Sequence, residues 1–160
     1  MPANCRVARL AVIPAQTPVP ASLLCLLWQC TEAEVATTLS ALAAKALLNV
    51  AKLPDGRVWC LPQQDQLAAL HASCRDRAPR DHARLLDGYT SGGLLPLAAV
   101  GDDGYFVQNV GHHLVGAGRL DQLRGLLLDP GWLVVKLGAA GVAGVVADFR
   151  RWVLDVCLVW

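Results

Sequence analysis

The sequence lacks the excess of basic residues that nucleic-acid-binding domains usually carry. It contains 14 Lys and Arg against 13 Asp and Glu, so its formal net charge is +1. Contacts to phosphate groups supply most of the affinity for nucleic acid, and they depend on a local excess of Lys and Arg. The composition therefore gives no electrostatic reason to expect a nucleic-acid partner or binding to an anionic membrane.

Other sequence signals are missing as well. No G-x-x-x-x-G-K-[ST] motif, which binds nucleotide phosphates, occurs in the chain, and the cysteines form no C-x-x-C pair. The first residues do not resemble a signal peptide, because Pro14, Pro18 and Pro20 interrupt any apolar segment. We expect a cytoplasmic protein without a cofactor, with reduced and mostly buried thiols. The cysteines are Cys5, Cys25, Cys30, Cys60, Cys74 and Cys157.

An uninterrupted apolar run long enough to cross a membrane is also absent. The most apolar region, residues 132–147, contains Lys136 and is followed by Asp148. The run between these charges is shorter than the ~18 residues of a membrane span. Since 54% of the residues are hydrophobic, we expect a folded core, no membrane contact, and a buried helix over this region.

Residues 22–61 predict two helices followed by two strands. Ser22 is placed to cap a short apolar helix over 23–28. Thr31 precedes a second helix and Glu34 follows three residues later, which is the spacing of a capping box. Apolar residues then recur at helical spacing. They are Val35, Leu39, Leu42 and Ala46.

A β-hairpin should follow these helices. Residues 47–51 and 57–61 are short β-capable runs, and the Pro-Asp-Gly sequence at 54–56 favours a tight turn between them. Two strands alone are only marginally stable, so the hairpin must pack on the helices. Two helices followed by a two-stranded wing is the order of a winged helix, which we expect over residues 1–78.

The remaining sequence predicts helices with short connections. A helix over 63–75 ends at the charged break RDRAPR, where we place a domain boundary, and Pro79 suits the first turn of the next helix. Residues 79–160 should form an antiparallel helical bundle, so the fold class is mainly α. The apolar run 6–13 is compatible with an extended segment, a strand or the end of a helix. The bundle helices are expected over 81–89, 105–116, 120–128, 132–137 and 139–152, with a glycine-rich loop over 90–104.

The histidines and cysteines do not form a recognisable chemical site. His112 and His113 are adjacent on a predicted helix, so their side chains diverge by about 100° and cannot chelate one ion together. We expect His113 to pack or hydrogen-bond within the bundle and His112 to be more solvated. A zinc site at Cys60, His71 and Cys74 lacks a fourth ligand, and Cys30 with His82 has no nucleophile signature. We therefore expect neither a metal site nor an enzyme.

The ordered motifs resemble the NB-ARC nucleotide switch proteins, the family of the apoptotic protease-activating factor. LAVIPAQTPVPASLLCLLW, EAEVATTLSALAAKALLNV and the hairpin resemble its winged-helix domain. HARLLDGY and GYFVQNVGHHLVGAGRLDQLRGLLLDPGWLVVKL resemble the helical domain that follows. The matching positions in the helical domain are Asn109, His113, Leu114, Leu126, Leu127 and Trp132. With Trp28, Leu39 and Trp59, we expect these residues to be structural.

The resemblance implies a non-catalytic regulatory module of a signalling NTPase, in apoptosis or defence-type signalling. In the family, such modules pack on the ADP-bound nucleotide-binding domain and relay signals to oligomerisation. The nucleotide-sensing histidine of the family is replaced near Pro62 and Gln63, and the P-loop domain is missing, so the chain looks like a fragment. Its expected partner is the nucleotide-binding domain of a parent or partner protein. The alternative is a stand-alone winged-helix adaptor that binds protein or DNA.

Overall fold

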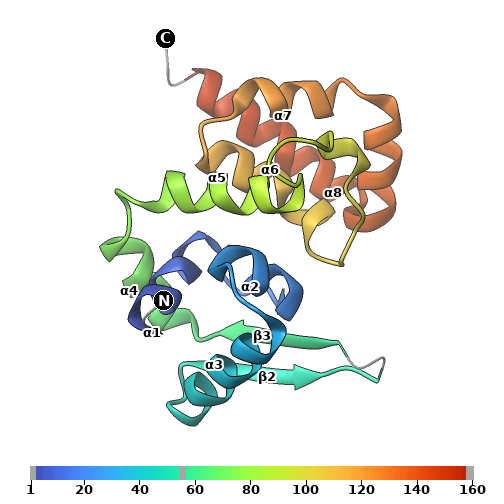
Figure 1. Ribbon diagram of the computed structural model, residues 1–160. Coiled ribbons are helices and arrows are strands. Elements are labelled where there is room, and N and C mark those ends of the chain that lie inside the picture. Colours follow the sequence, from blue (N-terminus) through green and yellow to red (C-terminus); the bar gives the residue numbers. More distant parts are fainter. Residues whose placement is uncertain (1–2, 55–56, 158–160) are drawn as a thin grey trace. The chain divides into compact units, whose positions relative to one another are not determined.

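The computed structural model describes residues 3–54 and 57–157 and divides the chain into two compact units (Figure 1). The first unit ends at Leu85 and the second begins at Leu86. The division falls inside helix α5 (Ala78–Tyr89), a few residues after the charged break where we expected it. Asp81 in the first turn of α5 pairs with Arg9 of the first unit at 3.6 Å, so the start of α5 belongs to that unit.

The first unit is helical with a small antiparallel sheet. The apolar run 6–13 is helical, since it lies in α1 and the 3-10 segment η1. The helical segments are α1 (Ala3–Arg9), η1 (Leu10–Val12), α2 (Ala21–Trp28), α3 (Glu32–Ala44) and α4 (Gln64–Ser73). The strands are β1 (Val19–Pro20), β2 (Leu48–Lys52) and β3 (Val58–Pro62).

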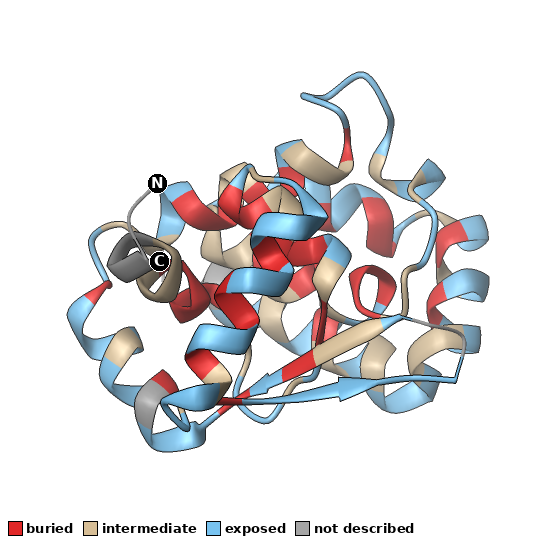
Figure 2. Cartoon of the chain, turned by 60° about the horizontal axis from the view of Figure 1, so that its bottom comes forward, coloured by how far each residue is buried: buried red, intermediate tan, exposed pale blue. Residues whose placement is uncertain are grey.

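The predicted hairpin is confirmed. Strand β2 pairs antiparallel with β3 in a register that sets Val50 opposite Cys60, one residue later at each strand than expected. The turn residues Asp55 and Gly56 lie outside the described residues. Strand β1 pairs with the other edge of β3, so the sheet order is β1-β3-β2. Strand β2 is exposed except at Leu48, whereas β3 is buried at Cys60 and Pro62. Figure 2 shows the greater burial of β3.

We predicted N-terminal caps for both α2 and α3, and the structure confirms the cap of α3 alone. The capping box is confirmed: the Thr31 hydroxyl accepts from the Glu34 N–H at 3.4 Å, and the Thr31 N–H donates to Glu34 Oε2 at 3.0 Å. The expected cap at Ser22 is wrong, because α2 begins at Ala21 with Pro20 in the capping position. The fixed φ of proline suits a helix start one residue earlier. Ala46, expected in the second helix, lies beyond its end.

Apolar side chains of η1, α2, α3, α4 and the three strands form the core of the first unit. Trp28 and Leu39 are buried, and the Trp28 indole N–H donates to the Arg6 carbonyl at 2.9 Å. Trp59 is half-buried, and within the described residues its indole nitrogen has no hydrogen-bond partner. The cysteines Cys25, Cys30, Cys60 and Cys74 carry free thiols, and the last two of them are buried.

The buried Cys60 thiol gives a pH-dependent prediction. Burial raises its pKa to about 12 from an ordinary value of 9.0. Between these values the folded state binds more protons than the unfolded state, so this thiol lowers stability as the pH rises. Urea unfolding at about pH 8 and about pH 10 should show wild type losing stability relative to Cys60→Ala as the pH increases. A difference between the two proteins that does not change with pH would contradict this assignment.

The second unit is a helical bundle, as expected. Helices α6 (Phe106–Gly116), α7 (Leu120–Leu127) and α8 (Pro130–Cys157) pack against one another, and the preceding loop contains the short segment η2 (Leu97–Ala99) (Figure 1). The end of α5 completes the bundle. The buried cluster consists of Leu86, Phe106, Val107, Val110, Leu114, Leu123, Leu126, Leu127 and Trp132.

Helix α8 departs most from the sequence prediction. The two expected helices form one segment that is interrupted at Gly141, whose φ of 64° and ψ of −175° suit glycine. Within the described residues α8 is also the one helix long and apolar enough to cross a membrane, over Pro130–Leu154, and 17% of the tested window is buried. The expectation of a buried helix is therefore wrong, because only its inner side is covered.

Candidate functional site

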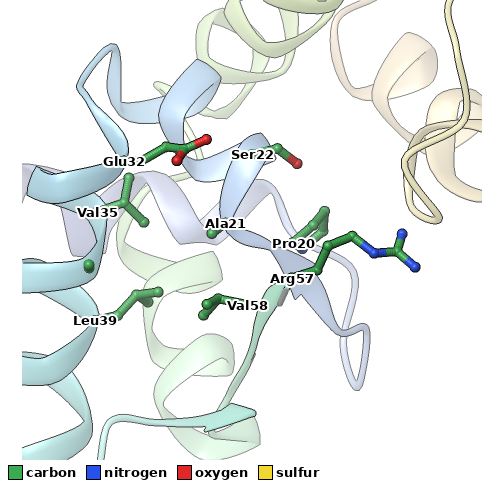
Figure 3. A pocket seen from close by; sticks show the side chains of 9 residues that line it. Pro20, Ala21, Ser22, Glu32, Val35, Leu39, Arg57 and Val58 are labelled. Carbon is green, nitrogen blue, oxygen red and sulfur yellow. The ribbon is translucent and has the colours of Figure 1, made fainter. Parts of the chain in front are cut away.

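The first unit contains a hollow that we call the α2–α3 groove. It has a volume of about 270 Å³ and lies between α2, α3 and the start of β3. Val35 and Leu39 from α3 point across it toward Val58 of β3 (Figure 3). The complete lining is Pro20, Ala21, Ser22, Glu32, Val35, Ala36, Leu39, Arg57 and Val58.

Local sequence features place these side chains. The capping box fixes the start of α3, and Val35 and Leu39 then lie one turn apart on the same side of the helix. Pairing of β1 with β3 brings Pro20 beside Trp59 and so holds the start of α2 near the strand. The groove is therefore built from segments that are distant in the sequence and joined by the sheet.

Charged groups stand at the edges of the α2–α3 groove. Glu32 lies in the first turn of α3, where a carboxylate interacts favourably with the helix dipole. Arg57 extends away from the apolar floor (Figure 3). The described lining contains no histidine or cysteine, and the volume is below the roughly 300–1,000 Å³ of typical small-molecule sites. The α2–α3 groove is therefore a small, mainly apolar hollow with charged groups at its edges.

The second notable feature is a buried ion pair on the inner side of α8. Lys136 Nζ lies 2.7 Å from Asp148 Oδ2, and both side chains are at most 2% exposed. The ammonium group also donates to the carbonyls of Val107 at 2.8 Å and Gln108 at 2.9 Å. The other Asp148 oxygen accepts from Arg151 at 2.7 Å. Each charge is thus matched by hydrogen bonds, as burial requires.

Two further observations describe the surroundings of the Lys136–Asp148 pair: the pKa of Lys136 and the space beside Gly111. Burial lowers the pKa of Lys136 below its usual value, and the Asp148 carboxylate acts in the opposite direction. Gly111 on α6 leaves the room that the Asp148 carboxylate occupies, because a Cβ at that position would overlap it. The pair joins the two halves of α8 on either side of Gly141 and joins α8 to α6. We interpret it as a structural clamp.

The burial of the two histidines of α6 is as predicted, but their orientation is not. The His112 and His113 rings are 5.2 Å apart between centroids, and a nitrogen of each lies within 4.8 Å of the other. The expectation that these adjacent side chains diverge too far to hold one ion together is therefore wrong. His113 is buried and its Nε2 lies 2.8 Å from the Tyr105 hydroxyl, whereas His112 is half-buried. Burial raises the pKa of Tyr105 well above its usual value, so this hydroxyl stays protonated. The Asn109 side chain donates to the Tyr105 carbonyl at 3.0 Å.

The other residues that the family resemblance marks lie in the bundle core. Leu114 and Leu127 are buried, and Trp132 is 2% exposed. The Trp132 ring meets the Phe106 ring edge-on, with the centroids 6.4 Å apart. These placements agree with the structural roles that we expect for the three residues.

The remaining residues considered from the sequence are divided between the surface and the interior of the protein. His71 is exposed on α4 with its Nε2 3.2 Å from the Ile13 carbonyl, while Cys60 and Cys74 are buried. Cys30 is half-buried and His82 is buried. At the position of the family histidine, Pro62 ends β3 and is buried, and Gln63 precedes α4 and is exposed.

Sequence reasoning missed both the α2–α3 groove and the buried ion pair. The class that the structure defines is a mainly helical protein with a small three-stranded antiparallel sheet in its first unit. No family model and no curated protein matches the sequence.

Proposed function

We propose that this chain is a non-catalytic regulatory module, a winged-helix domain followed by a helical domain, that packs on the nucleotide-binding domain of an NB-ARC-type switch protein. The order of elements in the first unit carries the proposal. Helix, strand, two helices and a hairpin follow one another, with β3 between β1 and β2 in the sheet. Within this series, the two helices followed by the hairpin have the order that we expect of a winged helix.

The second unit supports the same proposal. The positions that resemble the family's helical domain fall on α6, α7 and the start of α8, in the same order along the chain. Leu114, Leu127 and Trp132 contribute to one buried cluster. The resemblance therefore coincides with residues that build the bundle, and the role in signalling and oligomerisation follows from the resemblance.

The charges of α3 favour a protein partner over DNA, which is the alternative. A winged helix usually contacts DNA through one of its helices, but α3 carries Glu32 and Glu34 and has no basic residue before Lys45. Arg6 pairs with Glu34 at 3.2 Å, which offsets part of the negative charge without creating a basic face. Binding to DNA phosphates needs clustered positive charge.

Calorimetric titration of the purified chain separates these functions. We expect no measurable heat of binding with ADP or ATP, because the chain has no P-loop and no histidine at the family position. We also expect no binding of a random DNA duplex of about 20 base pairs at physiological salt. Tight nucleotide binding would contradict the proposed loss of the nucleotide site, and salt-dependent duplex binding would favour the DNA-binding adaptor.

A further inference from the structure

The outer side of α8 is an apolar surface, which we call the α8 face. Its large apolar side chains are all at least 37% exposed, and Val134 and Val142 reach about 70%. Among the described side chains of Pro130–Leu154, Arg150 is the one exposed charge. The face consists of Val134, Val135, Leu137, Val142, Val146, Phe149, Val153 and Leu154.

The spacing along the second half of α8 is that of a helix-packing seam. Val142, Val146, Phe149 and Val153 follow one another at intervals of four, three and four residues. Alternation of three and four keeps one side of a helix apolar along its length, and in coiled coils that side receives a partner helix. The regular spacing begins directly after the interruption at Gly141.

A hollow on the α8 face identifies a docking point. Val146, Phe149, Arg150, Val153 and Leu154 line an open depression of about 540 Å³. Within the described residues, no salt bridge of Arg150 is found. A guanidinium beside an apolar depression can bind a carboxylate while apolar side chains fill the depression.

The exposed apolar side chains of the α8 face are neighbours on one helix and are not isolated surface residues. The interruption at Gly141 divides the face into two parts, and the second part, residues 142–154, spans about 20 Å at the rise of an α-helix. Contiguous apolar patches of more than a few hundred Å² mark sites of protein or membrane contact in soluble proteins.

The neighbouring helices argue against an α8 that spans a lipid bilayer. Helices α6 and α7 pack on α8 and expose polar residues, among them Gln108, Asp121 and Arg124. These helices are 11 and 8 residues long, too short to span a bilayer. If α8 crossed a membrane with the bundle intact, their polar side chains would enter the hydrocarbon region at high cost.

The charge on the α8 face argues against a second copy of the chain. The described part of the face carries Arg150 and no exposed acidic side chain. A symmetric contact pairs the same surface on both subunits, so among the described side chains of the face it would offer no carboxylate to either guanidinium group. A partner helix with an acidic residue satisfies both the apolar seam and Arg150.

We propose that the α8 face docks an amphipathic helix of another protein, with an acidic side chain placed against Arg150. The inference goes beyond the proposed function, since it does not require the partner to bind a nucleotide. The probe is a labelled synthetic peptide of about three heptads with Leu at both core positions and Glu at the flanking positions. A matched peptide carries Lys in place of each Glu, and like charges at these positions disfavour self-pairing of either peptide.

Fluorescence anisotropy with the full chain measures the binding of both peptides. We expect the Glu peptide to bind wild type at least about fivefold more tightly than the Lys peptide. Arg150→Glu should reverse this preference. Arg124→Glu on α7, which makes the same change of net charge at another exposed position, should retain the wild-type preference.

Several results would overturn the inference. One is absence of peptide binding to wild type, and another is an Arg150→Glu variant that keeps the preference for the Glu peptide. Sedimentation equilibrium that shows a dimer of the chain, dispersed by Val146→Gln, would identify a second copy as the occupant. Binding to phosphatidylserine vesicles without peptide binding would identify a lipid surface.

Discussion

Asp148→Ala should destabilise the second unit by about 3–5 kcal/mol, because it leaves the Lys136 ammonium buried without its carboxylate. The two remaining partners of that ammonium are the carbonyls of Val107 and Gln108, which carry no net charge. Urea unfolding followed by circular dichroism measures the loss. Arg151 loses its partner as well, but it is partly exposed and can be solvated.

A double variant separates the effect of an unpaired charge from the loss of the pair itself. Lys136→Met with Asp148→Leu removes both charges and replaces them with apolar groups, so it should be much closer to wild type than Asp148→Ala. If the double variant is as unstable as the single variant, the loss arises from packing and not from the charge of Lys136.

The pH dependence of Asp148→Ala provides an independent test. Burial lowers the pKa of Lys136, and removal of Asp148 removes the largest influence that raises it. Between the lowered pKa and the ordinary value of 10.5, the unfolded state binds more protons than the folded state. Stability therefore rises with pH in that window, and Asp148→Ala should recover part of its loss relative to wild type at alkaline pH. A constant difference would contradict the charge explanation.

Trp132→Ala should cost about 3–5 kcal/mol. The side chain is buried, packs edge-on against Phe106 and belongs to the cluster shared by α6, α7 and α8. Since a domain is stable by only about 5–15 kcal/mol, the second unit should become loose or unfold. The first unit has its own buried residues and should partly survive.

Urea unfolding combined with hydrogen exchange on each unit measures the effect of Trp132→Ala. Leu128→Ala is the control, because Leu128 is exposed at the end of α7 and its removal should change stability by no more than about 0.5 kcal/mol. Near wild-type stability of Trp132→Ala would contradict its role in the core. Equal loss of protection in both units would show that they unfold as one cooperative unit.

Two features of the first unit could be predicted from short stretches of sequence. The Thr31–Glu34 capping box and the hairpin are each specified by a few neighbouring residues, and both are confirmed. Strand β1 was not predicted, because two prolines surround Val19 and the pairing with β3 is not local. For the same reason the α2–α3 groove could not be foreseen, since its lining comes from three separate segments.

The pairing of Lys136 with Asp148 could not be derived from helical spacing. The residues are 12 positions apart, so a regular α-helix would separate them by about 18 Å along its axis and by about 120° around it. They lie 2.7 Å apart because the chain changes direction at the interruption at Gly141. Sequence hydrophobicity also does not show which apolar side chains are covered, which is why the exposure of the α8 face was not expected.

The sequence of the complete transcript that encodes this chain tests the proposed function most directly. We expect an in-frame region upstream that encodes G-x-x-x-x-G-K-[ST] between a predicted strand and a predicted helix. Such a region would supply the nucleotide-binding domain on which the winged-helix and helical domains are proposed to pack. A transcript that encodes no such motif would contradict an NB-ARC module in its own polypeptide and would favour the stand-alone adaptor.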